Sequence, residues 1–527
     1  MHKVTIANKN IQAVEKIKWM FQHYWLLLAF LVGKMILQMM VVNPVYELHR
    51  DEFLYLDQAQ HLAPGFISVP PLMSWVSVLV FGLGGSEFWV RFFPALFGAL
   101  TILFSWLMVE ELGGRIYSKI LICCALLFSV FVRLDILFQP NSFDILTWTA
   151  VFYFLVRYLR TQKPLWLFCL VLVFVLGLYN KYNIVFLIVG LLAGILYTRE
   201  RKVLVSKYFY FGFLLGFLLM LPNVIWQITN NFPVLHHMRA LKRTQLDFTS
   251  PLGFLMDQLM FVSGSLVLII AAFVGLAIYK PFKIYRVVGY TYLMVMLIFI
   301  SLKAKSYYAI GLYPVLLVFG GVYLEAVISI AWKKYIIGFL VLANLVTFML
   351  IYNLVFPVLK PMDIIANKDQ FEKLGLLKWN DGKNHHLPQD FADMLGWKEM
   401  AAKALAAYEM VPQDEWAQTL IFCDNYGQAG ALNYYNRGKM PQAYSFNTDY
   451  IFWLPRMKEI KNVVLVGDTP EDNITAMFNG FELVDRVDNK FAIEKNTPVY
   501  LLTGASPEFT PGFYKELDQR IAGFDIF

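Results

Sequence analysis

Residues 46–72 read YELHRDEFLYLDQAQHLAPGFISVPPL, a polar and acidic segment that separates one strongly apolar run from a series of others. Two adjacent carboxylates, Asp51 and Glu52, follow an arginine, and a third acid stands at Asp57. Acidic groups are costly beside a membrane unless they have a function there. We therefore interpret this segment as the catalytic loop of an enzyme embedded in a membrane.

The composition indicates a polytopic membrane protein. Of the 527 residues, 58% are hydrophobic and 17% are aromatic, whereas a soluble domain rarely exceeds about half apolar residues. The net charge of +7 does not indicate a nucleic-acid partner, because the basic residues lie between apolar runs, where they orient the chain in the bilayer. The four cysteines form neither a disulfide framework nor a metal-ligand spacing. The basic N-terminus shows no signal-peptide cleavage pattern.

Long apolar runs predict about eleven membrane-spanning helices. The run 72–83 is too short to cross about 30 Å of hydrocarbon, and we expect it to form a helix in the interface plane, after an amphipathic stretch at 53–62. The predicted spans are approximately 25–42, 92–110, 119–134, 142–159, 165–179, 183–198, 208–228, 254–279, 286–302, 307–329 and 335–357.

Basic residues also predict the orientation. With the N-terminus in the cytoplasm, every predicted inner loop carries Lys or Arg, and the unusual polar residues gather in the outer loops. We therefore expect the active site on the outer side of the membrane. The predicted parts are a cytoplasmic N-terminus (1–24), a transmembrane catalytic domain (25–358, first outer loop 43–91) and an outer α/β domain (359–527).

The predicted outer domain has a different pattern from the apolar region. Short β-type runs occur at 419–423, 463–466 and 499–502, and helical patterns lie between them at 390–410 and 428–435. About 165 residues are enough for a separate hydrophobic core.

Two acids are candidates for the chemistry. Asp51, held near apolar surface, would have a raised pKa and could take a proton from a hydroxyl, or bind a divalent metal beside a phosphate. The alternative is a helix N-cap or an ion pair with Arg50. Asp144 lies about one turn inside the outer end of an apolar span, which makes it a functional candidate. Its alternative is a structural pair with an outer-loop lysine.

Cations and aromatic residues at the same predicted surface suit a lipid-linked phosphate. Lysines at the outer span ends could bind phosphate, or could simply reach the headgroups. The basic loop after residue 232 could hold phosphate or attract anionic lipid, and the tyrosines could stack on a sugar or anchor a span. The candidate phosphate-binding residues are Lys181, Lys303, Lys305, Arg239 and Arg243, and the candidate substrate-lining residues are Tyr55, Tyr307, Tyr308, His236 and His237.

Seven stretches, in this order, resemble the bacterial family-39-type glycosyltransferases of the GT-C fold, whose relatives include protein O-mannosyltransferases and lipid A aminoarabinose transferases. They cover most of the apolar region and reach into the predicted outer domain. The stretches are HRDEFLYLDQAQHLAPGFISVPPL, LGGSEFWVRFFPALFGAL, FQPNSFDILTW, GLYNKYNIVF, LPNVIWQITNNFP, KSYYAIGLYPVL and FCDNYGQAGALNYY.

The resemblance implies a GT-C membrane fold and transfer, with inversion, from a polyprenyl-phosphate-linked sugar to a hydroxyl group. Asp51 matches the acid taken in the family as the base or activating acid, and Asp144 matches its second acid. Lys181 looks like the lysine near the donor phosphate, and Lys305 belongs to a Tyr-rich loop. Glu52 completes the acidic pair. No nucleotide is implied. Family members divide over a divalent metal (Mg, Mn or Zn), for which Asp51 and Asp144 would be the ligands.

The acceptor expected from this resemblance is an envelope lipid, glycan or protein, and the expected location is the bacterial cytoplasmic membrane. The sequence alone leaves a membrane transporter or lipid flippase as the alternative. Transporters place their polar groups near the bilayer midplane, often with internal repeats, whereas here these groups gather at one predicted interface and no repeat is visible.

Overall fold

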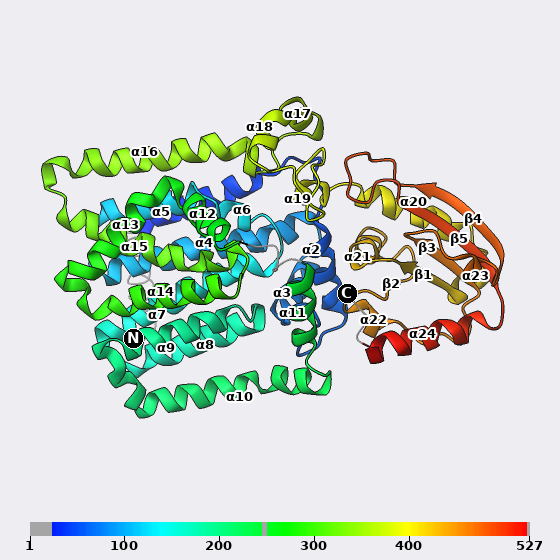
Figure 1. Ribbon diagram of the computed structural model, residues 1–527, viewed down its shortest axis with the longest axis horizontal. Helices are drawn as coiled ribbons and strands as arrows, with labels where there is room; N and C mark the ends of the chain where they lie inside the picture. The colour runs from blue at the N-terminus through cyan, green and yellow to red at the C-terminus, as the bar shows by residue number, and fades with distance from the viewer. Residues whose placement is uncertain (1–23, 245–249, 524–527) are drawn as a thin grey trace, which may run out of the picture.

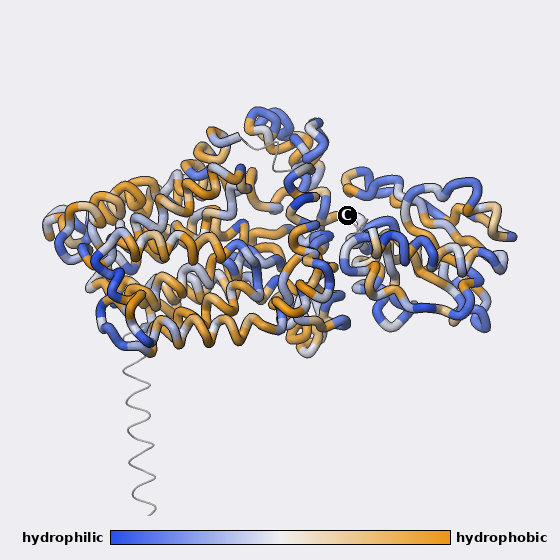
Figure 2. The backbone as a smooth tube through the Cα atoms, turned by 60° about the horizontal axis from the view of Figure 1, so that its bottom comes forward, coloured by the Kyte–Doolittle hydropathy of each residue, from blue (hydrophilic) through white to orange (hydrophobic). Residues whose placement is uncertain are grey.

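The computed structural model describes residues 24–244 and 250–523. Long helices form a bundle, and a smaller α/β part lies against one end of it (Figure 1). Apolar residues follow the lengths of the bundle helices, and hydrophilic segments lie at their ends and in the α/β part (Figure 2). These features confirm the predicted combination of apolar helices with a C-terminal sheet.

Each predicted span corresponds to a helix or a pair of helices. Five helical segments, namely α4, α10, α14, α15 and α16 with their short 3-10 extensions, are long and apolar enough to cross a membrane, and α12 with α13 forms a pair bent by 63°. The number of eleven crossings stays a prediction, because several other segments form shorter helices. The bundle helices are Tyr24–Met40, α4 (Glu87–Glu111), α5 (Ile116–Leu127), α7 (Pro140–Thr161), α8 (Pro164–Asn180), α9 (Ile184–Leu196), α10 (Lys207–Thr229), α12 (Pro251–Phe261), α13 (Leu266–Ile278), α14 (Arg286–Ser301), α15 (Tyr313–Val327) and α16 (Ile330–Val355).

Burial divides these helices into inner and outer ones. Most side chains of α7 and α15 are buried, including Trp148 and Phe319. In contrast, α10 and α16 expose rows of large apolar side chains such as Phe213 and Phe339. Exposed apolar surface of this extent is unfavourable in water and favourable against lipid. The inner helices therefore carry the core of the bundle, and the outer ones suit contact with a bilayer.

The segment between the first helix and α4 lies at the end of the bundle that faces the sheet. It forms α2 (Arg50–Asp57) and α3 (Leu72–Gly82), and the predicted short helix at 72–83 is thus present. The apolar side chains of α2 are buried, and α2 packs between α3 and α21 (Tyr426–Tyr435) of the α/β part. The short helices elsewhere are α6 (Phe131–Leu134), α11 (Pro233–Thr244), α17 (Pro361–Ala366), α18 (Lys368–Lys373), α19 (Gln389–Ala392), α22 (Tyr450–Trp453) and α23 (Asp472–Thr475).

The α/β part contains a five-stranded sheet of order β2-β1-β3-β5-β4. The first three strands in this order are parallel, and β5 is antiparallel to both of its neighbours. The β-type runs predicted near 419, 463 and 499 are β1, β3 and β5. The strands are β1 (Thr419–Cys423), β2 (Ala443–Ser445), β3 (Asn462–Val466), β4 (Phe478–Arg486) and β5 (Pro498–Ala505).

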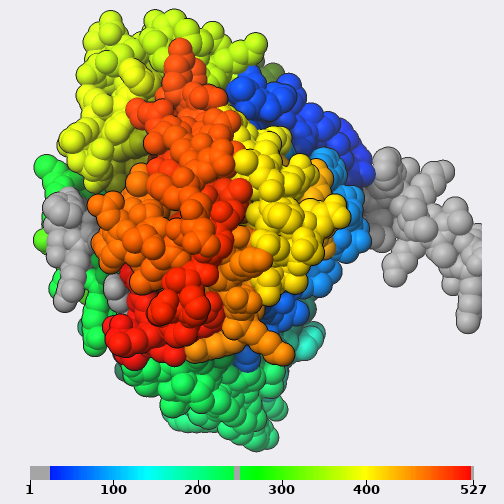
Figure 3. Space-filling model, turned by 90° about the vertical axis from the view of Figure 1, so that its right-hand side faces the viewer, coloured from blue at the N-terminus to red at the C-terminus, as the bar shows by residue number. Residues whose placement is uncertain are grey.

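Alternating side chains of the sheet enter two different cores, as the two-residue period of a strand requires. Ile421 and Val464 join a cluster with α20 (Trp397–Glu409) and α21, whereas Leu420 and Val463 pack with α24 (Phe509–Gly523). The first of these clusters continues without a break to Phe53 on α2. Viewed from this end, the C-terminal part, coloured yellow to red, covers most of the bundle (Figure 3). One hydrophobic cluster therefore spans the boundary between the two parts.

Candidate active site

Glu52 fixes the start of α2. One of its carboxylate oxygens accepts the backbone N–H of His49 at 2.6 Å, which forms a capping box. The other oxygen accepts the backbone N–H of Phe138, also at 2.6 Å, in the loop before α7. The side chain is only 1% exposed. Because backbone groups take both oxygens, the geometry favours a positioning role for Glu52 over direct contact with a substrate.

Asp51, the next residue back along α2, is the acid that remains accessible. Its side chain is 32% exposed. Oδ1 accepts the hydroxyl of Tyr426 at 2.6 Å, and Oδ2 accepts the side-chain amide of Gln139 at 3.0 Å. Burial raises the pKa of Asp51, but the charges of His49 and Arg50 and the bond from Tyr426 outweigh burial and lower it. The apolar setting alone predicted a raised pKa, and the structure corrects this. Asp51 is therefore ionised at neutral pH and ready to accept a proton.

Asp144 lies in the first turns of α7 and is buried. Its two oxygens accept the indole N–H of Trp148 at 2.9 Å and the side-chain amide of Asn183 at 3.1 Å. Lys181, which directly follows α8, is its main electrostatic partner. The charge of Lys181 thus acts on Asp144, and the same lysine is linked to the Asp51 region through Asn141.

A chain of hydrogen bonds runs from Asp51 to Lys181, whose charge acts on Asp144. Gln139, which donates to Asp51, accepts from Asn141 at 3.1 Å. Asn141 in turn accepts from the Lys181 ammonium group at 2.9 Å, and Lys181 interacts with the charge of Asp144. The polar residues at the start of α7 thus lie between Asp51 and Asp144 and hold them in one site.

Two lysines place positive charge in this site. The Lys181 nitrogen lies 4.9 Å and 4.5 Å from the ring centres of Tyr307 and Tyr308. Burial, opposed by Asp144 and assisted by the like charge of Lys305, lowers the pKa of Lys181 to about 8. Burial also lowers the pKa of Lys305, and the charge of Asp51 opposes it. Lys181 therefore remains largely cationic at neutral pH within a partly enclosed site.

The other predicted site residues differ in how deeply they are buried. Tyr55 is buried one turn after Asp51, whose charge contributes to raising the Tyr55 pKa after burial. His237 on α11 is half-buried, and burial together with Lys305 lowers its pKa. In contrast, Lys303 and Arg239 are exposed. His236 is half-buried on α11, and the side chain of Arg243 lies outside the part of the chain that the structure describes.

Four uncharged residues of the site were not predicted individually: Gln139, Asn141, Asn183 and Tyr426. All four lie within or directly beside the stretches FQPNSFDILTW, GLYNKYNIVF and FCDNYGQAGALNYY. The signal that could have found them is the occurrence of amides and a tyrosine at helix ends next to the predicted acids and lysine.

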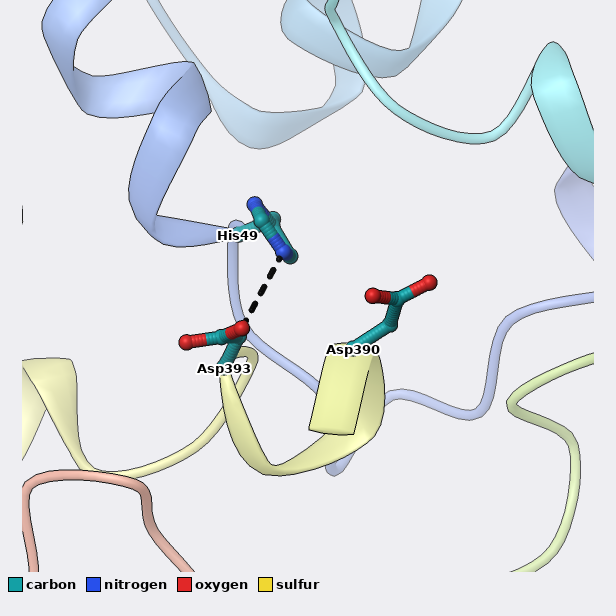
Figure 4. A group of neighbouring side chains, drawn as sticks. All are labelled: His49, Asp390 and Asp393. Carbon is teal, nitrogen blue, oxygen red and sulfur yellow. Dashed lines mark ion pairs between the residues drawn. The ribbon is translucent and has the colours of Figure 1, made fainter. Parts of the chain in front are cut away.

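A separate group has the composition of a metal site. Within the described residues, ligand-type atoms of His49, Asp390 and Asp393 lie within 4.8 Å of one another (Figure 4). However, Arg133 binds Asp390 at 2.8 Å, and Arg50 lies 3.5 Å from Asp393. Although burial lowers the pKa of His49, Asp393 and Asp51 raise it to about 9, so this imidazole is protonated and does not offer a ligand. The group is therefore a balanced ion-pair network.

The predicted metal ligands Asp51 and Asp144 also have other partners. Hydrogen-bond donors occupy both oxygens of each acid, and the cation that pairs with Asp144 is Lys181. This arrangement does not fit an ion shared by the two acids. A divalent metal remains a prediction from the family resemblance alone.

Comparison with known proteins agrees with this architecture. Residues 68–226 match the family model described as dolichyl-phosphate-mannose-protein mannosyltransferase. No curated protein matches the sequence. The fold is similar to ArnT from Cupriavidus metallidurans bound to undecaprenyl phosphate, with a TM-score of 0.59, 14% identity, and coverage of 91% of this chain and 98% of ArnT. ArnT in the apo state gives a TM-score of 0.58 at 14% identity, with coverage of 93% and 98%.

The match to the family model extends from the loop before α3 to α10, so it includes Asp144 and Lys181. Together with the fold, it relates the chain to the membrane glycosyltransferases of the GT-C type. Within that class the chain is related to the protein mannosyltransferases and to ArnT. The predicted family resemblance and enzyme class are thereby confirmed.

Proposed function

We propose that the protein transfers a sugar from a polyprenyl-phosphate carrier to a hydroxyl group of an envelope lipid, glycan or protein, with inversion at the sugar. The observation that carries this proposal is the connected group of Asp51, Lys181 and Asp144, with the charge of Lys305 acting on Asp51. It combines a proton acceptor with cations for a phosphate. The undecaprenyl phosphate bound to ArnT, which shares the fold over almost its whole length, supports the same class of carrier.

In the proposed reaction, the acceptor hydroxyl approaches the exposed side of Asp51. Its oxygen attacks the anomeric carbon, and the bond between that carbon and the carrier phosphate breaks. Asp51 takes the hydroxyl proton, and the electron pair of the broken bond stays on the carrier phosphate. Lys181 and Lys305 stabilise the charge that develops there, and a single preorganised group of this kind is worth about 10²–10³ in kcat. A single displacement of this kind inverts the anomeric carbon.

The position of the site in the bundle supports an enzyme over the alternative of a transporter or flippase. Asp51 lies on α2, the amides lie at the start of α7, Lys181 follows α8, and Lys305 follows α14. Hydrogen bonds join Asp51 to Gln139, Asn141 and Lys181, and α2 packs against α21 of the α/β part. Transporters, in contrast, bind their substrates near the midplane. With the basic inner loops of the sequence, we propose that this site faces the outer side of the cytoplasmic membrane.

Two conservative substitutions test the proposal. Asp51→Asn and Asp144→Asn keep the side-chain shape and remove the charge. We expect each to lower transfer from a radiolabelled polyprenyl-phosphate sugar by about 10²-fold or more, with normal amounts of folded protein in the membrane. Asp518→Asn is the control, because Asp518 lies on α24, is exposed and pairs with Arg456.

Full transfer by both Asp51→Asn and Asp144→Asn would contradict the proposed site. Mass spectrometry of envelope glycolipids from cells with and without the gene would identify the sugar and its acceptor. In that comparison, the proposal requires one glycosylated species to disappear when the gene is absent.

A further inference from the structure

We propose that the C-terminal α/β part supplies a residue to the active site: Tyr426 is a positioning residue that holds the catalytic carboxylate of Asp51. This inference rests on the proposed function, since it concerns the same proton acceptor. The Tyr426 hydroxyl donates to Oδ1 of Asp51 at 2.6 Å, across 375 positions of sequence. The contact thus joins the first loop of the membrane part to the sheet.

The backbone around Tyr426 is fixed by an extensive cap. The side chain of Asn425 accepts the N–H groups of Gly427 and Gln428 at 2.9 Å and 3.0 Å. Gln428 reaches back to the N–H of Asn425 at 3.3 Å, which completes a capping box. Glu494, from the connection between β4 and β5, accepts from the side chains of Asn425 and Gln428 at 3.2 Å and 2.8 Å. The sheet, rather than the bundle, therefore determines where the Tyr426 hydroxyl lies.

The position of Tyr426 in the sheet topology is a common one for functional residues. It follows the carboxyl end of β1, and β1 lies between β2 and β3, to which it is parallel. The chain leaves β1 for β2 on one side and later returns to β3 on the other. In open α/β sheets, ligands bind outside the carboxyl ends of strands at such a switch point. Here α21, which begins beyond that edge of the sheet, packs against α2, so it borders the bundle site.

The hydrogen bond from Tyr426 restrains the orientation of the Asp51 carboxylate. Gln139 holds the second carboxylate oxygen at 3.0 Å, and the Arg50 guanidinium lies 5.9 Å from the centre of the Tyr426 ring. Each carboxylate oxygen has further capacity to accept a hydrogen bond, and the exposed side of Asp51 leaves this capacity to an acceptor hydroxyl. Without the phenol hydroxyl, the carboxylate is free to turn toward the charges of Arg50 and His49.

The same interface contains a matched control. Tyr450 also donates its hydroxyl to a carboxylate of α2, that of Asp57, and also at 2.6 Å. Asp57 is 2% exposed and has no open side for a substrate. Both tyrosines thus attach the α/β part to the same helix by the same kind of bond, and only Tyr426 contacts the proposed proton acceptor.

The test compares Tyr426→Phe with Tyr450→Phe in the full-length protein. The assay measures kcat and the KM for a polyprenyl-phosphate sugar, together with the thermal midpoint in detergent. Loss of a hydrogen bond to a charged group corresponds to a change of about ten- to hundredfold in a rate constant. We expect Tyr426→Phe to lower kcat by that factor with its KM for the donor nearly unchanged, and Tyr450→Phe to lower the thermal midpoint while kcat stays near the wild-type value.

Two results would overturn the inference. One is a wild-type kcat for Tyr426→Phe. The other is an equal loss of kcat in both variants, which would mean that attachment of the α/β part alone matters. Wild-type and Asp51→Asn proteins are measured alongside. If these two show equal turnover, the proposed function fails and the inference fails with it. If Asp51→Asn is inactive and Tyr426→Phe is fully active, only the inference fails.

Discussion

Replacing Lys181 with glutamine tests the proposed binding of the donor phosphate. The lysine nitrogen contacts Asn141 and lies over two tyrosine rings, in a partly enclosed site next to Asp144. Glutamine keeps most of the side-chain length and a hydrogen-bond donor, and it removes the charge. The substitution therefore reports on the charge more than on the packing.

The expected magnitude follows from the setting of the lysine. Two unit charges about 4 Å apart attract by about 4 kcal/mol at an effective dielectric constant near 20. Desolvation cancels part of this, and hydrogen bonds to charged groups contribute about 1.5–3 kcal/mol net. With about 2 kcal/mol lost, the Kd for a polyprenyl-phosphate sugar should rise about thirtyfold in Lys181→Gln. The exposed Lys303 offers a control, since Lys303→Gln should change the Kd by less than about twofold.

The pH dependence gives a second readout. The pKa of Lys181, lowered to about 8 by burial, means that the charge is present below pH 8 and is lost as the pH rises through 8. Donor affinity of the wild type should therefore fall across this range, because the phosphodiester of the donor keeps its own charge. Lys181→Arg should remove the fall, since arginine stays protonated.

Titration of the purified protein with the donor in detergent, followed by tryptophan fluorescence, would provide these Kd values. An unchanged Kd in Lys181→Gln would refute the assignment of Lys181 to the donor phosphate. The same loss of affinity with rising pH in Lys181→Arg would show that another group titrates.

Two further predictions concern Asp57 and the ion-pair network around His49. Burial raises the pKa of Asp57 from 3.8 to about 7, so its stabilising contribution is present below about pH 4 and is lost as the pH rises through 7. Asp449, whose pKa burial raises to about 6, acts in the same direction. The thermal midpoint should fall between about pH 4 and about pH 7 in the wild type and fall less in Asp57→Asn, and identical curves would contradict this reasoning. The ion-pair network of His49, Asp390 and Asp393 predicts that removal of divalent metal with a chelator leaves sugar transfer unchanged. A loss of activity that Mn²⁺ or Zn²⁺ restores would show instead that an ion binds there or at Asp51.

Much of the fold follows from local sequence patterns. Long apolar runs predicted the bundle helices, because each run is sufficient to specify a helix in an apolar environment. The runs rich in β-branched residues predicted β1, β3 and β5. The three-residue β2 and the exposed β4, which contains Gly480 and charged residues, have no such pattern. These two strands are defined by their pairing with the rest of the sheet.

For the site, the sequence identified the charged residues and missed their neutral partners. Asp144 and Lys181 attract notice because charge in or beside an apolar span is costly. Uncharged side chains such as those of Gln139 and Tyr426 cost little free energy anywhere on a surface, so they do not attract notice. No spacing rule relates Tyr426 to Asp51. The lowered pKa of Asp51 could not be predicted for the same reason, since it depends on partners brought together by the tertiary fold.

The shared core of α2 and α21 also has a consequence for biogenesis. Ribosomes make α2 early and α21 late. During membrane insertion, the helix that bears Asp51 is therefore present before α21 has been synthesised. A polypeptide released before residue 426 would contain Asp51, Asp144, Lys181 and Lys305. It would lack the Tyr426 hydroxyl that holds the Asp51 carboxylate. We expect such incomplete products to be inactive, so that premature termination does not leave active fragments that consume the lipid carrier.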